Sequence, residues 1–185
     1  MNCSTCNAHI RAVNGKTKQY NSFKYYIEKL TLIDLKKILS QIPDPEIPVI
    51  NIVELGIVRE AKMVAESEAE IIITPTYSAC PAMYNIEEDI IKLFKEIGIT
   101  AKVITVISPP WTTDWITDEA REKLRVYGIT PPEKGADKDH LNKPKPCPRC
   151  GSENTKQISR FGSTLCKASY QCNDCLEPFD YFKCH

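Results

Sequence analysis

The chain has 185 residues, of which 42% are hydrophobic, and its 24 Lys and Arg residues balance its 24 Asp and Glu residues. A chain of this length can bury one sizeable core and carry an appendage. No apolar run approaches the roughly 18 to 20 residues that span a bilayer, so a membrane protein is not expected. The first residues lack a basic segment followed by an apolar one, so no secretory signal is expected either.

Charge distribution and cysteine content further narrow the kinds of protein that this chain can be. Residues 31–132 carry sixteen acidic and ten basic side chains, whereas a nucleic-acid reader concentrates Lys and Arg on one face. The nine cysteines are an odd number, and several form C-x-x-C pairs. This pattern favours metal ligation in a reducing compartment over a disulfide framework. We therefore expect a cytoplasmic protein that binds protein or small-molecule partners, with no nucleic acid and no membrane.

The first predicted elements lie in residues 31–75. Apolar residues at helical spacing predict a helix over 31–42. Three prolines between residues 43 and 48 end it, because a proline ring clashes with the preceding helical turn and lacks an N–H. Residues 44–48 are then a rigid loop. Two β-rich runs, 57–64 and 69–75, flank a polar turn and predict a hairpin.

The elements that follow complete one domain. Apolar residues three and four positions apart predict a second helix over 81–97, with Gly98 beyond its end. Residues 102–108 predict a third strand, and residues 117–127, closed by Gly128, a third helix. The order helix, strand, strand, helix, strand, helix predicts a small α+β sandwich with helices packed on a three- or four-stranded sheet.

Composition divides the chain into four parts. Residues 1–30 predict a leader, and residues 31–130 contain the α+β domain. Residues 131–146 lose the apolar pattern and spread four prolines near charged side chains, which predicts a semi-stiff linker. Residues 147–185 form a cysteine-rich tail.

The strongest chemical signal is the pair of motifs Cys147-Pro-Arg-Cys150 and Cys172-Asn-Asp-Cys175, which 21 residues separate. Two such knuckles bring four thiolates into a tetrahedron, and a tail of about 40 residues has too little core to fold without this clamp. We predict a zinc ribbon whose closed site is structural. The alternatives are iron in place of zinc, and Cys166 or Cys184 in place of one of the four ligands.

Cys80 is the second signal, because it lies where a predicted strand ends and a helix begins, just before Pro81. Unpaired N–H groups and the positive end of the helix dipole lower the pKa of a thiol there, which makes it a better nucleophile or metal ligand. Asp44, in the proline-fixed loop, is a candidate second group. The competing interpretations are an inert core cysteine and an aspartate that only shapes the turn.

Two further motifs each allow two interpretations. Trp111 and Trp115 flank a polar tripeptide after a pair of prolines, which fits either packing or a protein-contact surface. Cys3, Cys6 and His9 form a C-x-x-C-x-x-H pattern near the start of the chain. This pattern fits either a metal clip without its fourth ligand or a flexible leader.

Four segments, in chain order, resemble the SufT/PaaD-type iron–sulfur assembly domain. They are residues 44–48 (Asp-Pro-Glu-Ile-Pro), 55–58 (Leu-Gly-Ile-Val), 74–81 (Thr-Pro-Thr-Tyr-Ser-Ala-Cys-Pro) and 109–115 (Pro-Pro-Trp-Thr-Thr-Asp-Trp). The tail resembles the zinc ribbon of the PaaD family of phenylacetate-CoA oxygenase accessory proteins, through residues 147–150, 161–167 and 177–184. The resemblance runs from Leu32 to His185, and the leader departs from it.

This resemblance implies a non-catalytic maturation role: delivering or inserting iron–sulfur clusters into the multicomponent enzyme that epoxidises the ring of phenylacetyl-CoA. It implies that Cys80 is the reactive or cluster-contacting thiol and that Asp44 is the acid facing it. The implied cofactors are structural Zn²⁺ and a transient iron–sulfur cluster. The expected partner is an iron–sulfur client, the reductase subunit of the oxygenase, and a homodimer is the oligomeric form to test.

Three other functions compete with this one. In the first, the chain is a stoichiometric structural subunit of the oxygenase, and Cys80 is merely packed. A thiol oxidoreductase is the second, but Cys147 and Cys150 lie outside any βαβ unit and have metal partners. The third is a nucleic-acid-binding ribbon, although residues 133–185 carry only nine basic side chains against seven acidic ones and lack a dense basic stripe.

Overall fold

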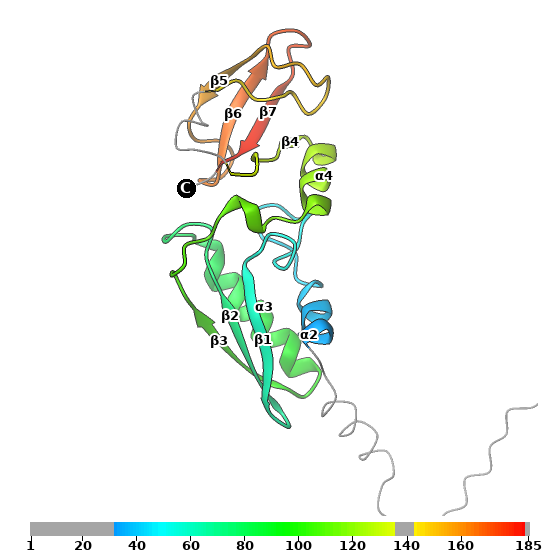
Figure 1. The fold of residues 1–185 in the computed structure, drawn as a ribbon, viewed down its shortest axis with the longest axis vertical. Coiled ribbons are helices and arrows are strands. Elements are labelled where there is room, and N and C mark those ends of the chain that lie inside the picture. The colour runs from blue at the N-terminus through cyan, green and yellow to red at the C-terminus, as the bar shows by residue number, and fades with distance from the viewer. Residues whose placement is uncertain (1–31, 136–142, 184–185) are drawn as a thin grey trace, which may run out of the picture.

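The computed structural model describes residues 32–135 and 143–183. They form an α+β domain with a small β domain stacked on one end of it, opposite the β1–β2 turn (Figure 1). The motif of Cys3, Cys6 and His9 lies outside these residues, as does Cys184. Within the two described ranges, no helix is both long enough and apolar enough to cross a membrane.

A three-stranded sheet is the centre of the α+β domain. Strands β1 (Val58–Ala65) and β2 (Glu68–Ile73) form an antiparallel hairpin, and β3 (Thr100–Thr105) lies parallel to β2, in the order β1-β2-β3. Parallel neighbours need a long crossover connection. Helix α3 (Ala82–Glu96) is this crossover and lies against one face of the sheet (Figure 1).

Helix α3 confirms the predicted helix over 81–97 to within one residue at each end. Its apolar stripe, which includes Ile86, Ile90 and Phe94, is fully buried. Beyond its C-cap, Gly98 adopts φ +78° and donates its N–H to the Lys95 carbonyl at 3.0 Å. Left-handed backbone at this position is the reason that glycine ends the helix.

The first helix is shorter than predicted. Helix α2 spans Leu32–Leu39 instead of 31–42. The chain then forms a tighter turn, in which the N–H of Ile42 donates to the Leu39 carbonyl three residues earlier, at 3.1 Å. Pro43 accounts for this difference, because a residue before proline avoids the helical region. Pro43 instead pairs with Asn51 in an isolated β-bridge.

Strand bounds also shift from the predicted ones. The predicted 57–64 and 69–75 become β1 and β2, since Ala65 pairs with Glu68 across a two-residue turn. The predicted strand over 102–108 starts two residues earlier and ends at Thr105, because pairing with β2 begins at Glu68 and Thr100. Register with a neighbouring strand, which local composition does not encode, fixes these ends.

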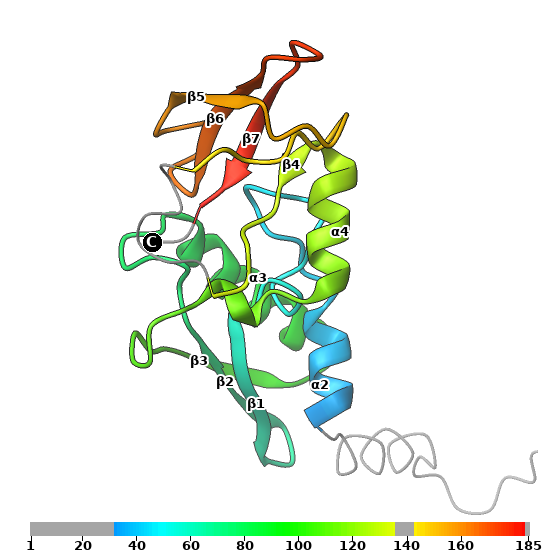
Figure 2. The ribbon, with the colours of Figure 1, turned by 45° about the horizontal axis from the view of Figure 1, so that its top comes forward.

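Helix α4 (Asp118–Tyr127) confirms the third predicted helix and leads toward the second domain. It follows the short 3₁₀ helix η1 (Thr113–Trp115), and Gly128 closes it at φ +97° as predicted. Figure 2 shows α4 running up from the level of the three-stranded sheet to the ribbon.

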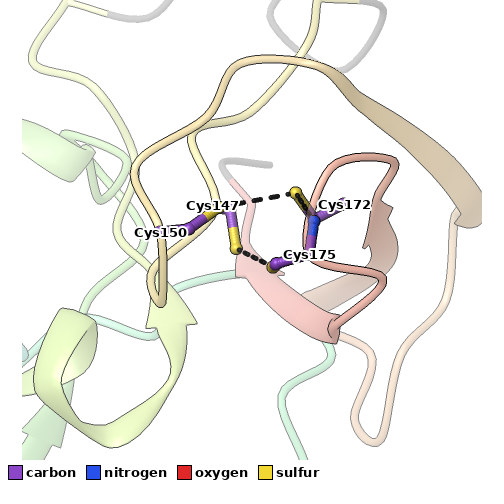
Figure 3. A group of neighbouring side chains, drawn as sticks. All are labelled: Cys147, Cys150, Cys172 and Cys175. Carbon is purple, nitrogen blue, oxygen red and sulfur yellow. Dashed lines mark hydrogen bonds between the residues drawn. The ribbon is translucent and has the colours of Figure 1, made fainter.

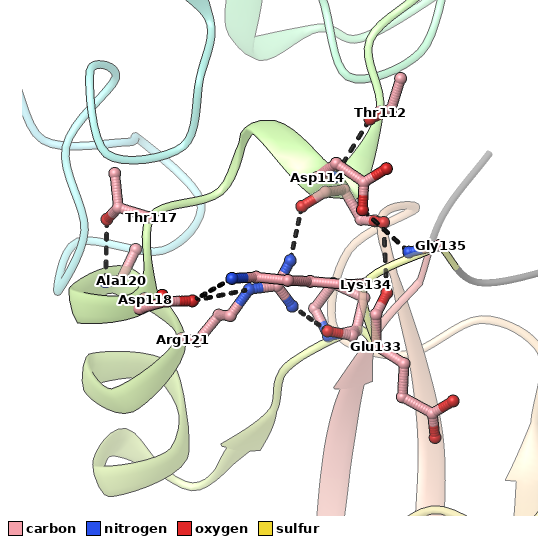
Figure 4. Close-up of polar contacts among 11 residues, drawn as sticks. Thr112, Asp114, Thr117, Asp118, Ala120, Arg121, Glu133, Lys134 and Gly135 are labelled. Atoms are coloured by element: carbon pink, nitrogen blue, oxygen red, sulfur yellow. Dashed lines mark hydrogen bonds and ion pairs between the residues drawn. The ribbon is translucent and has the colours of Figure 1, made fainter.

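A polar network holds the chain on either side of α4 (Figure 4). The Arg121 guanidinium donates to the carbonyls of Pro132 and Thr113, the latter at 2.6 Å. The backbone N–H of Gly135 donates to Asp114 Oδ1 at 2.8 Å. These bonds join the segment entering α4 to the segment leaving it, so they fix the direction in which the chain departs for the second domain.

The second domain is a four-stranded sheet in the order β4-β7-β6-β5. Strands β5 (Thr155–Ser159), β6 (Lys167–Cys172) and β7 (Pro178–Phe182) come from the tail and pair antiparallel. The unpredicted β4 (Ile129–Thr130) directly follows α4 and pairs parallel with β7. The first domain therefore contributes one short strand to the sheet of the second.

Each domain has its own core. The first buries mainly aliphatic side chains, including Leu35, Leu39 and Ile71, whereas the second buries a small cluster of aromatic and sulfur-containing side chains: Cys147, Ala168, Tyr170, Cys172, Phe179 and Tyr181. This architecture confirms the predicted α+β class with a following ribbon. The predicted domain boundaries at 30, 130 and 146 stay a prediction.

Candidate metal centre and thiol site

Four cysteines of the ribbon gather into one group. The ligand atoms of Cys147, Cys150, Cys172 and Cys175 all lie within 4.8 Å of one another. Two come from the turn before β5, one from the end of β6 and one from the turn that follows it (Figure 3). The Sγ atoms of Cys147 and Cys175 are 3.7 Å apart, and those of Cys150 and Cys172 are 3.6 Å apart.

The donor set of this tetrad fits zinc. Four sulfurs at this spacing from two knuckles are the ligand set of a structural zinc site, which leaves no open position for chemistry. The N–H of Cys175 donates to the Cys172 sulfur at 3.5 Å, and this bond is the main cause that lowers the pKa of Cys172 to about 7. A thiol that ionises readily suits a metal ligand, because only the thiolate coordinates.

Cys80 lies in the connection between β2 and α3, as its sequence position predicts. Its side chain is half-buried and packs against the core of the first domain. Its backbone N–H donates to the Tyr77 carbonyl at 3.1 Å, and its carbonyl accepts from Met83 N at 3.3 Å. The turn before α3 therefore holds the thiol in place.

The predicted net lowering of the Cys80 pKa is wrong in direction, although the start of α3 itself acts in the predicted direction. Burial raises the pKa of Cys80, and this outweighs the lowering by the Ala82 N–H group at the start of α3. The carboxylates of Glu46 and Asp44 raise it further, and the Thr76 hydroxyl lowers it. Partial burial next to two carboxylates is a tertiary effect, and it disfavours the thiolate more than one turn of helix favours it.

Asp44 is buried in the loop between α2 and β1, with 6% of its surface exposed. Its Oδ1 accepts from the N–H groups of Glu46 and Ile47 at 2.9 and 2.8 Å. Burial raises the pKa of Asp44, and the two N–H groups oppose that shift. The side chain therefore both shapes the loop and adds to the electrostatic environment of Cys80.

Sequence reasoning missed the role of Glu46, whose charge acts on Cys80. The Cys166 thiol of the ribbon donates to Glu46 Oε2 at 3.2 Å, although 120 residues separate them. Burial raises the pKa of Tyr77, and the charges of Cys80, Glu46 and Cys166 add to the shift. The position of Glu46 within the same proline-fixed loop as Asp44 is the sequence signal that could have identified it.

The two tryptophans have different environments. Trp111 is 5% exposed, donates its Nε1–H to the Leu55 carbonyl at 3.0 Å, and packs edge to face on Phe182 of the ribbon with ring centroids 6.1 Å apart. Packing is therefore its role. Trp115 is half-buried, and the Arg59 guanidinium lies 3.3 Å above its ring. Trp111 also lines a cavity of about 270 Å³ together with residues 74–78, Ile107 and Pro110.

Comparisons with known proteins match both halves of the chain. Residues 34–106 match the family model described as an iron–sulfur cluster assembly protein, and residues 131–183 match the PaaD zinc beta ribbon domain. A subunit of the Escherichia coli "Putative 1,2-phenylacetyl-CoA epoxidase" is 51% identical over 148 residues, which cover 80% of this chain and 89% of that protein. The chain belongs to the PaaD family. The family resemblance predicted from its motifs is thereby confirmed.

Other relatives cover only the first domain of this PaaD-family chain. The Fe–S protein maturation auxiliary factor of Porphyromonas gingivalis is 31% identical over 93 residues, which cover 49% of this chain and 88% of that protein. A solved domain of unknown function from Bacillus anthracis is 25% identical with a TM-score of 0.45, covering 56% of this chain and 92% of that one. A conserved hypothetical protein from Thermotoga maritima is 28% identical with a TM-score of 0.44, covering 52% and 95%.

Proposed function

We propose that this chain is an accessory factor that binds iron–sulfur clusters on their way to a phenylacetyl-CoA epoxidase, and that Cys80 is the sulfur that contacts the cluster. One observation carries the proposal: a half-buried thiol under the influence of two carboxylates, Asp44 and Glu46. It lies within the region that matches iron–sulfur assembly proteins. The chain's E. coli relative, which is named as part of an epoxidase, supports the choice of client.

The electrostatics of Cys80 suit a site that acts only when its cargo arrives. Burial and the neighbouring carboxylates raise the pKa of the thiol, so without metal the sulfur stays protonated at neutral pH. A bound iron ion supplies the positive charge that reverses this balance, since metal coordination deprotonates a thiol and releases its proton. Sulfur is also the soft donor that iron–sulfur clusters prefer over oxygen.

The ribbon has a different role in this proposal. Cys147, Cys150, Cys172 and Cys175 would hold zinc, and zinc would supply a structural clamp with no open coordination position. The chain itself uses the clamp to hold β5, β6 and β7 in a domain whose core is small. We propose a reducing cytoplasm as its location, because there the thiols stay available for metal, and the reductase subunit of the epoxidase as the client.

The test measures cluster content in the client. With Cys80→Ser in the full chain, we expect iron and sulfide in the purified reductase to fall several-fold, while zinc in the variant chain stays at the wild-type level. Ala79→Ser is the matched control, because it places the same hydroxyl one residue away at an exposed position. A reductase with unchanged iron content beside the Cys80 variant would overturn the proposal.

A second candidate function is that of a stoichiometric component of the epoxidase. The E. coli relative is named as one of the subunits of such an enzyme, which favours this function, and so does the burial of Trp111 and Phe182 in a rigid interdomain contact. Purification of the chain with the other components in fixed ratio, together with full epoxidase activity of the Cys80→Ser variant, would select this function over cluster delivery.

A further inference from the structure

Cys166 belongs to the ribbon in sequence but to the first domain in packing. It is 4% exposed and lies, with Phe182, in the same buried cluster as the aliphatic core of the first domain. The other buried apolar residues of the tail form the separate ribbon cluster described above. The segment before β6 therefore places a sulfur atom in the neighbouring domain.

The backbone fixes Cys166 from both sides. Its carbonyl accepts from Lys183 N at 3.0 Å, just beyond β7, and the N–H of Lys167 donates to the Thr164 carbonyl at 3.1 Å. The Thr164 hydroxyl lies 3.0 Å from the Cys166 sulfur. Zinc bound at the tetrad would also fix the adjoining ends of β6 and β7, so the ribbon would hold the Cys166 thiol in one position.

Glu46 connects the two thiols outside the tetrad. Its Oε2 accepts from the Cys166 thiol at 3.2 Å, and its charge also acts on the Cys80 thiol. The charges of both sulfurs, Cys80 and Cys166, contribute to the raised pKa of Tyr77. Other ionisable groups facing this cluster are Asp44, whose charge acts on Cys80, and Lys167, whose charge acts on both Asp44 and Cys166.

A cleft borders this group of residues at Glu46 and Lys167. It has a volume of about 610 Å³ and lies between the domains. Glu46 and Lys167 line it, together with Ser163, Ser169 and Asp180 of the ribbon. A proton released at Cys166 therefore has a carboxylate acceptor that borders open solvent.

The spacing of the groups favours a cluster over a single ion. Among the described residues, only the ribbon tetrad brings three or more ligand atoms of Cys, His, Asp or Glu within 4.8 Å of one another. Cys80, Cys166 and the two carboxylates thus do not form such a group. A cluster with several iron atoms distributes its ligands over different metals, so it tolerates wider spacing.

We propose that Cys166 is a second sulfur ligand for the iron–sulfur cargo, beside Cys80, so that the two domains form the cargo site together. This inference rests on the proposed function of Cys80. On binding, the S–H bond of Cys166 breaks and a sulfur–iron bond forms, while the proton passes to Glu46 and then to water in the cleft, with no change of oxidation state. Two thiolates are fewer than the usual four, which leaves iron positions open for the receiving protein.

The experiment uses the full chain with its zinc in place, incubated without oxygen with Fe(III), sulfide and excess dithiothreitol as the reductant, and then desalted. We expect the wild type to retain iron with sulfur-to-iron charge-transfer absorption. Cys80→Ser, Cys166→Ser and Cys166→Ala should each retain at least roughly ten-fold less, because even losing a supporting partner of a metal ligand costs about 10- to 100-fold in affinity. Glu46→Gln should weaken retention within that range, whereas Glu133→Gln, an exposed carboxylate outside the cluster, should not.

Zinc content and far-UV circular dichroism show whether each variant is folded, and the pair of Cys166 variants separates loss of sulfur from a poorly tolerated hydroxyl. If both folded Cys166 variants retain iron like the wild type while Cys80→Ser does not, the two-domain site is wrong and the proposed function stands. If Cys80→Ser also retains iron like the wild type, or the wild type retains none, both proposals are wrong.

Discussion

The two domains of this chain reach stability by different routes. The first domain buries a continuous, mainly aliphatic core between its sheet and helices α2, α3 and α4, including Leu35, Ile71 and Phe94 at 0% exposure. The ribbon's own buried cluster contains six residues, two of which are cysteines of the tetrad. A core of that size rarely supports a fold without a metal or disulfide clamp. In the proposed zinc-bound form the sulfur site would therefore be structural, while the domain with its own core can leave a thiol without a permanent metal.

Of the changes considered, removal of zinc should produce the largest difference in stability between the two domains. When a chelator strips the metal from the reduced full chain, we expect β5, β6 and β7 to unfold, because zinc contributes about 10–16 kcal/mol to folding in small zinc-finger peptides. The first domain should keep its structure. Limited proteolysis with mass spectrometry checks this, with zinc restored as the control. Protection of residues 147–183 in the metal-free chain would show that the ribbon has a sufficient core of its own.

A substitution that creates a cavity in the first domain should destabilise that domain and leave the ribbon intact. Phe94→Ala removes a fully buried ring from α3, and we expect a loss of about 3–5 kcal/mol in the free energy of unfolding of that domain. Zinc content should not change, since the tetrad lies in the other domain. Urea unfolding followed by circular dichroism, with zinc measured on the same samples, checks both parts. Equal loss of zinc and structure would mean that the two domains fold as one unit.

The contact between the domains should have the smallest effect. Trp111→Phe keeps a ring against Phe182 but removes the Nε1–H bond to the buried Leu55 carbonyl. We expect a cost of about 1–3 kcal/mol, because the carbonyl loses its partner. Trp115→Phe is the matched control, which makes the same change at a half-buried side chain in contact with Arg59. Thermal unfolding compares the two variants, and an equal or larger loss from Trp115→Phe would contradict this account of the contact.

Local pattern was enough to predict most elements of the fold. The spacing of Ile86, Ile90 and Phe94 predicts α3 to within one residue, because a helix buries one stripe whatever it packs on. The strand ends were wrong by one to three residues, because pairing with a neighbour sets them. The short strand β4 was missed, since its two residues carry no periodicity and exist as a strand only beside β7.

The same distinction applies to the candidate site, where local pattern predicts one part and the tertiary structure sets the rest. The spacing of the cysteine pairs predicts the tetrad, because each knuckle is local and a four-sulfur zinc site tolerates a variable loop between knuckles. The direction of the Cys80 pKa shift was wrong, because the helix terminus is visible in the sequence whereas burial and Glu46 are not. The contact between Cys166 and Glu46 spans 120 residues, and no local pattern encodes it.

The sequence by itself determined the two kinds of domain, the helices and the four sulfurs of the ribbon, because each of these depends on residues close together in the chain. Only the tertiary structure decided that Trp111 is packed, that burial and two carboxylates raise the pKa of Cys80, and that Cys166 packs in the core of the first domain. The physical reason is that desolvation and charge act through space, so they depend on which distant residues the fold brings together.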